Sequence, residues 1–130
     1  MSNIYDRGVV ILDFGSQYTQ LIARRVRELN VYSFILPPET SIDKILSLKP
    51  GALILYGGPS SIDDQKAPVF DQKILDIDLP ILGICYGLHL LTHYSGGKVS
   101  STGTGEYGFA NINIFETENL FKGIRSPAVW

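Results

Sequence analysis

Four short apolar runs, each followed by residues at helical spacing, constrain this chain more than any other feature of its sequence. The runs cover residues 8–14, 32–36, 52–56 and 80–84. Strands buried on both faces have this length and composition, and strands alternating with helices are typical of βαβ units. We therefore predict an α/β fold built on one open, mostly parallel, doubly wound sheet.

The segments between the runs are predicted to be helices because their apolar residues recur at three- and four-residue spacing. Ser16 is a suitable cap for the first helix, which ends at Asn30. A short helix follows the strand breaker Pro37-Pro38. The pattern over residues 69–77 predicts a third helix, and residues 88–94 continue as a fourth.

The last part of the chain has a different pattern. Residues 109–115 alternate apolar and polar side chains, which predicts a half-solvated strand at a sheet margin, and residues 127–130 also suggest a strand. The sequence contains no internal repeat and no interdomain linker. We therefore expect residues 1–130 to form a single domain, and 45% hydrophobic residues suffice for its core.

Composition argues against several classes of partner. The net charge of -2 comes from 11 basic and 13 acidic residues spread along the chain, so we expect binding to neither nucleic acid nor membrane. The apolar runs are far shorter than the roughly 20 residues of a membrane span, and the chain opens without the apolar stretch of a secretory signal. One cysteine and two histidines are too few for a disulfide or a structural zinc site. We expect a cytoplasmic protein with no metal site.

Cys85 lies at the point where a predicted buried strand turns into a helix. The sequence Gly83-Ile84-Cys85-Tyr86-Gly87 is a nucleophile elbow with sulfur in place of a hydroxyl. The two glycines allow the backbone segments of the tight turn to approach each other. Backbone N–H groups and the helix dipole at a helix start favour the thiolate form of a cysteine. We therefore predict that Cys85 is a catalytic nucleophile rather than a buried packing residue.

A second loop supplies groups that such a nucleophile needs. The main-chain amide of Tyr86 follows the nucleophile and is one candidate donor to an oxyanion. Gly57-Gly58-Pro59 follows the third strand at the same sheet edge, and glycine there lets the backbone approach a substrate. We predict the amide of Gly58 as the second donor.

The chain offers no convincing general base. Its two histidines, His89 and His93, follow Cys85 by four and eight residues on the same predicted helix. Their side chains would therefore run along that helix instead of facing the sulfur. We interpret His89 as a residue of the pocket wall or of the packing, and His93 as a surface or packing residue.

Several segments resemble a known family. Residues 11–28 look like the opening of the GMP synthetases, and residues 57–59 and 83–87 match the class I glutamine amidotransferases generally. Residues 96–99 and 105–108 also resemble segments of this family, so the resemblance spans the whole chain. The elbow alone would fit amidotransferases of other biosynthetic branches, whereas the opening segment favours the GMP branch. The fold implied is flavodoxin-like and class I glutamine amidotransferase-like.

The resemblance implies a reaction and its partners. Glutamine would be hydrolysed through a thioester on Cys85, and the ammonia would pass to an ATP-pyrophosphatase (synthetase) domain or subunit that aminates XMP to GMP. No cofactor is needed for the glutaminase step, while ATP and Mg belong to the synthetase domain. By resemblance, Gly58 and Tyr86 form the oxyanion hole. Substrate-binding roles fall to Gly57, Pro59 and His89, and a role in coupling the two domains falls to Glu106.

Two departures from the family pattern modify these expectations. His89 stands where the family usually carries a glutamine that contacts the substrate. The family's catalytic histidine and glutamate lie further along than Trp130, so we expect an active site that is incomplete at the carboxyl end and a fragment that is inactive alone. The alternatives are a non-catalytic binding or regulatory module with the same fold and, more weakly, a flavodoxin-like nucleotide-binding domain.

Overall fold

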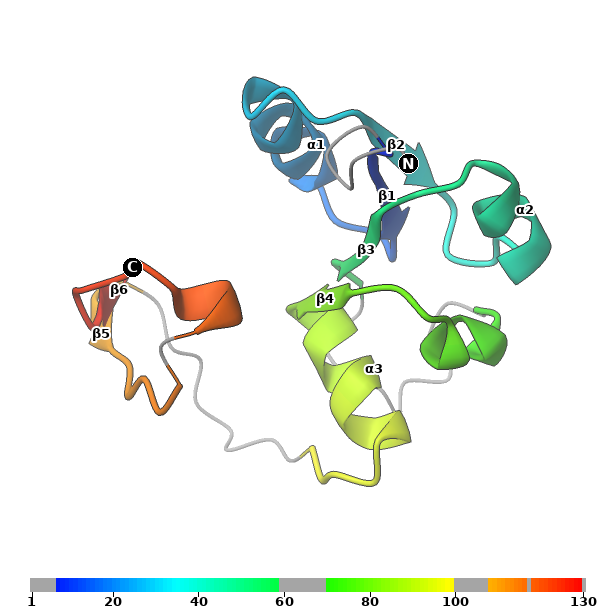
Figure 1. Ribbon diagram of the computed structural model, residues 1–130. Coiled ribbons are helices and arrows are strands. Elements are labelled where there is room, and N and C mark those ends of the chain that lie inside the picture. Colours follow the sequence, from blue (N-terminus) through cyan, green and yellow to red (C-terminus); the bar gives the residue numbers. More distant parts are fainter. Residues whose placement is uncertain (1–6, 59–69, 100–107, 117, 130) are drawn as a thin grey trace. The chain divides into compact units, whose positions relative to one another are not determined.

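The computed structural model describes residues 7–58, 70–99, 108–116 and 118–129 (Figure 1). These residues belong to two compact units, one within residues 1–99 and one within residues 100–130.

The first unit contains a four-stranded sheet with the strand order β2-β1-β3-β4. Every pair of neighbouring strands is parallel. Each strand lies inside one of the four apolar runs, so the predicted parallel sheet is confirmed. The strands are β1 (Val9–Asp13), β2 (Ser33–Leu36), β3 (Ala52–Tyr56) and β4 (Ile81–Ile84).

Helices cover both faces of this sheet, as a doubly wound fold requires. Alternate residues of a strand point to opposite faces. On one face, Ile11 and Ile54 pack with Ala23 of α1 (Thr19–Glu28). On the other face, residues including Leu12 and Leu55 pack with buried side chains from three helices. These are Ile45 of α2 (Ile42–Ser47), Ile74 of the 3₁₀ helix η2 (Gln72–Asp76), and both Tyr86 and Leu90 of α3 (Tyr86–Tyr94).

The first helix begins later than predicted. α1 starts at Thr19, and the hydroxyl of Ser16 accepts a hydrogen bond from the Tyr18 N–H at 3.1 Å instead of capping the helix. Ser16 therefore belongs to a turn between β1 and α1, and the predicted cap is wrong.

The predicted third helix is a single short 3₁₀ segment. Asp71 caps η2 by accepting the Lys73 N–H at 3.1 Å, and its other carboxylate oxygen accepts the Ile42 N–H of α2 at 3.1 Å. This tie fixes the start of η2, and β4 begins only a few residues after η2 ends. The connection is therefore too short for a longer α-helix.

The second unit contains a two-stranded antiparallel sheet, formed by β5 (Ala110–Asn111) and β6 (Ala128–Val129), and the 3₁₀ helix η3 (Asn119–Phe121). The strand predicted over residues 109–115 is therefore only two residues long, and it pairs with β6 and not with the four-stranded sheet. The strand predicted near the end of the chain is confirmed.

Among the helices described, none is both long and apolar enough to cross a membrane.

Candidate active site

The candidate residues are positioned by the loops that follow the strands at the carboxyl edge of the parallel sheet. Phe14 follows β1, Gly57 follows β3 and Cys85 follows β4, so all three lie at the same edge. β1 pairs with β2 on one side and with β3 on the other, which makes the β1–β3 boundary the topological switch point. Open α/β sheets bind their ligands in the crevice at such a point.

Cys85 occupies a strained turn between β4 and α3. Its backbone angles are φ 57° and ψ -122°, and it is the N-cap residue of α3. A non-glycine residue in this region costs free energy and persists only where the surrounding structure holds it. The cysteine is exposed and forms no disulfide. The turn therefore presents Cys85 to solvent at the carboxyl edge of the sheet.

Close backbone packing explains the two glycines of the elbow. A Cβ on Gly83 would lie 2.8 Å from the main-chain carbon and oxygen of Gly87. A Cβ on Gly87 would collide with the carbonyl oxygen of Leu55, on the neighbouring strand β3. The first turn of α3 therefore lies directly against the sheet, which fixes the position of Cys85.

The two-glycine loop, Gly57-Gly58, lies against the elbow. Both residues have positive φ angles, 83° and 114°, that side chains rarely adopt. A Cβ on Gly58 would lie 2.7 Å from the Tyr86 ring and 2.9 Å from the Phe14 Cβ. A Cβ on Gly57 would collide with Ser16. The structure thus brings together the segments of Gly58 and Tyr86, which the sequence suggested as the oxyanion donors.

Three contacts between aromatic rings support the two-glycine loop and the elbow. The Phe14 ring lies 5.7 Å from the Tyr86 ring and 6.0 Å from the Phe70 ring, measured between centroids. Phe70 in turn contacts Tyr94 at the end of α3, at 5.5 Å. Phe14 and Tyr86 are buried, so the loop and the elbow share one apolar support.

Asp13, at the end of β1, is a polar residue that sequence reasoning did not single out. Burial of its carboxylate would raise its pKa, but hydrogen bonds from the Gly15 N–H, the Ser16 N–H and the Thr19 hydroxyl outweigh burial, so the pKa lies below its ordinary value. A carboxylate directly after a buried strand and before a Gly-Ser turn was the available signal.

The remaining residues that the sequence suggested for the site are the two histidines, Pro59 and Glu106. His89 and His93 both lie on α3; His89 is half-buried and His93 is exposed. Pro59 and Glu106 lie outside the described residues. Among the residues that the structure describes, no group of three or more His, Cys, Asp or Glu side chains could hold a metal ion.

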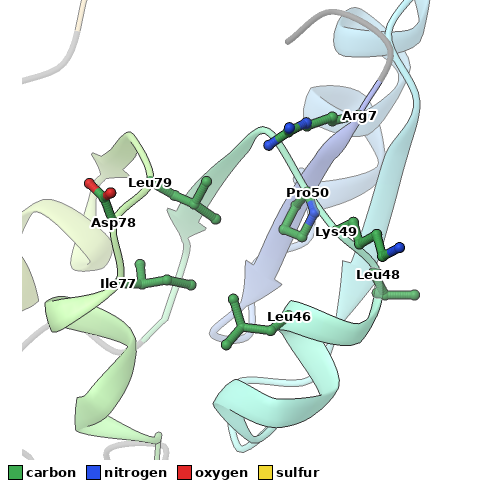
Figure 2. Close-up of a pocket in the computed structure, with 8 residues that line it drawn as sticks. All are labelled: Arg7, Leu46, Leu48, Lys49, Pro50, Ile77, Asp78 and Leu79. Carbon is green, nitrogen blue, oxygen red and sulfur yellow. The ribbon is translucent and has the colours of Figure 1, made fainter. Parts of the chain in front are cut away.

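A separate pocket opens at the other edge of the sheet (Figure 2). Its lining includes Arg7, Pro50 and Leu79, which precede β1, β3 and β4 respectively. None of the candidate catalytic residues lines it. This pocket is therefore distinct from the site around Cys85.

Comparison with known families identifies the class. The family model for class-I glutamine amidotransferases matches residues 10–130. The chain therefore belongs to the class-I glutamine amidotransferase family, in agreement with the doubly wound sheet and the cysteine elbow.

Individual relatives narrow the comparison to one branch. The chain is 52% identical to a glutamine-hydrolysing GMP synthase of Brachyspira hyodysenteriae and 45% identical to that of Bacillus subtilis, with all of this chain covered. It spans about a quarter of the length of these curated relatives, 25% and 26%. A crystal structure from Thermoplasma acidophilum, described as that of a candidate GMP synthase subunit, matches with a TM-score of 0.74 and 30% identity, covering 95% of this chain and 62% of that one. The predicted resemblance to the GMP branch is thus confirmed.

Proposed function

We propose that this chain is the glutamine-hydrolysing part of a GMP synthase, with Cys85 as the nucleophile. The observation that carries the proposal is the position of Cys85, held with positive φ at the start of α3 beside a glycine loop that packs on Tyr86. The family match and the GMP synthase relatives support the same assignment. They favour it over a nucleotide-binding or purely regulatory module.

The reaction begins with attack of the Cys85 sulfur on the side-chain amide carbon of glutamine. A carbon–sulfur bond forms, and the carbonyl oxygen becomes an oxyanion that accepts hydrogen bonds from the main-chain amides of Gly58 and Tyr86. Collapse of this intermediate breaks the carbon–nitrogen bond, and the nitrogen leaves as ammonia once it has taken up a proton. Water then cleaves the thioester, releasing glutamate and restoring the thiol. Gly57, Pro59 and His89 would contact the bound glutamine.

Proton transfer in this scheme is assigned to a histidine oriented by a glutamate outside these 130 residues, as the family resemblance implies. The alternative donors, His89 and His93, lie on α3 itself, four and eight residues after the nucleophile. A base on the same helix is poorly directed toward a sulfur at that helix's start.

The ammonia would be consumed by a synthetase domain or subunit of the ATP-pyrophosphatase type, which binds ATP and Mg and aminates XMP to GMP. Two findings support such a partner: the GMP synthase relatives are about four times longer than their matched part, and the Thermoplasma neighbour is itself described as one subunit of a synthase. Glu106 is a candidate for coupling the two activities. A cytoplasmic location fits this role.

Mass spectrometry after incubation with a diazoketone analogue of glutamine tests the proposal. The samples are this chain, its Cys85→Ala variant, and a version extended past Trp130 with the corresponding residues of the Bacillus subtilis GMP synthase. We expect one adduct on Cys85 in the extended chain and none in its Cys85→Ala variant. Folded wild-type proteins that remain unlabelled in both lengths would indicate a non-catalytic module instead.

A further inference from the structure

The turn after β1 is organised by a single carboxylate oxygen. Asp13 Oδ1 accepts hydrogen bonds from the Gly15 N–H at 2.9 Å, the Ser16 N–H at 3.1 Å and the Thr19 hydroxyl at 2.9 Å. Thr19 is the first residue of α1 and is buried. Asp13 therefore ties the end of a central strand to both the turn and the following helix.

This turn is in direct contact with the two-glycine loop. The Phe14 N–H donates to the Tyr56 carbonyl oxygen at 2.9 Å, immediately before Gly57. Ser16 lies so close to Gly57 that a Cβ added to Gly57 would have no room. The Phe14 Cβ lies against Gly58. The loop of Gly57 and Gly58 thus rests on the segment that Asp13 holds.

Glycines cannot fix their own conformation. Gly57 and Gly58 have no side chains to anchor them, and their positive φ angles are only one of several regions open to glycine. The position of the Gly58 amide must therefore be set by what packs around the loop, namely Ser16 at Gly57, and Phe14 and the Tyr86 ring at Gly58.

We propose that Asp13 is a positioning residue for the oxyanion hole, acting through Ser16 and Phe14 to hold the Gly57-Gly58 loop against Tyr86. This inference rests on the proposed glutaminase function. Asp13 touches neither substrate nor sulfur in this scheme; it sets where the Gly58 amide points. Hydrogen bonds to a charged acceptor are stronger than neutral ones, so one carboxylate can hold the whole turn.

The test compares two electrophiles on Cys85. Labelling by the diazoketone analogue of glutamine places a proton on the diazo carbon, forms a bond from the Cys85 sulfur to that carbon and releases N2, with the ketone oxygen held by the Gly58 and Tyr86 amides so that the carbon lies at the sulfur. Iodoacetamide alkylates the sulfur with loss of iodide and needs no such placement. A displacement of about 1 Å, or loss of one oxyanion donor, costs about 100-fold in rate. Asp13→Ala is therefore expected to slow diazoketone labelling about 100-fold and iodoacetamide labelling less than about 3-fold.

Asp13→Asn provides the conservative rescue. Its amide oxygen can replace Oδ1 as the acceptor of all three hydrogen bonds, without the charge. We expect a loss of about 10-fold, between wild type and Asp13→Ala. This variant also carries the test if Asp13→Ala does not fold.

Asp71 supplies matched controls, because its carboxylate also accepts hydrogen bonds from main-chain N–H groups. These hydrogen bonds connect it to neither the two-glycine loop nor the elbow. Asp71→Ala and Asp71→Asn should retain the wild-type ratio of the two labelling rates even if they lower the unfolding temperature. All variants are made in the chain length, original or extended, in which the diazoketone labels the wild-type protein.

The outcomes separate the two proposals. Absence of diazoketone labelling in the wild type overturns the proposed function itself. Wild-type labelling with an unchanged rate ratio in folded Asp13→Ala and Asp13→Asn overturns only the role of Asp13. Equal ratio changes in the Asp71 variants would reduce Asp13 to a general contribution to folding and would likewise overturn it.

Discussion

Replacing Gly87 with alanine should destabilise the first unit and displace Cys85. Gly87 is buried in the first turn of α3, and an added Cβ would collide with the carbonyl oxygen of Leu55. The Leu55 Cβ would also be only 2.8 Å away. Leu55 is fully buried in β3, which is hydrogen-bonded to β1 and β4 on either side. Because the strand cannot move aside, the helix must.

The magnitude follows from two opposing effects. Overpacking a closely packed site costs about 1–3 kcal/mol, and a backbone contact in a central strand belongs at the upper end. Alanine regains about 1 kcal/mol over glycine within a helix. The net loss is therefore about 2 kcal/mol, which corresponds to a fall of about 10 °C in the unfolding temperature of a domain this size.

Thermal unfolding followed by far-ultraviolet circular dichroism measures this loss. Leu88→Ala is the matched control, since Leu88 neighbours Gly87 on α3 but is 54% exposed. It should lower stability by less than about 1 kcal/mol. A Gly87→Ala variant as stable as wild type would show that α3 does not lie against β3 as described, and the account of the elbow glycines would fail.

Three further predictions concern the loop, a cap and the core. Gly58→Ala should slow labelling of Cys85 by the diazoketone at least about 10-fold. A φ angle of 114° is strained for alanine, and the added Cβ would lie 2.7 Å from the Tyr86 ring. An unchanged labelling rate, measured by mass spectrometry, would contradict this prediction. Hydrogen bonds from the Ile42 and Lys73 N–H groups lower the pKa of Asp71, so its stabilisation is present above about pH 4 and is lost as pH falls through the folded-state pKa. Urea midpoints of wild type and Asp71→Asn should therefore converge in acid, and a constant gap would refute the cap. Ile74→Ala should cost about 2–5 kcal/mol in urea unfolding because the side chain is fully buried, whereas a cost under about 1 kcal/mol would place η2 off the core.

Local pattern alone was sufficient for the strands and for the turn at Cys85. The run over residues 52–56 coincides with β3, since a strand buried on both faces must be apolar throughout. Gly83 and Gly87 around Cys85 indicated a tight turn because only glycine permits such close backbone approach. The opening segment then indicated the amidotransferase branch, which the relatives share.

Long-range contacts decided what the pattern missed. η2 is short because Asp71 bonds to Ile42, 29 residues earlier, and no periodicity near residue 71 encodes that partner. β5 is two residues long because its partner is β6, and alternation does not reveal which strand a strand pairs with. The sequence by itself determined the parallel sheet, the elbow and Cys85. Only the tertiary structure placed Ser16, which Asp13 holds, against Gly57, because that contact joins segments distant in the sequence through the strand order of the sheet.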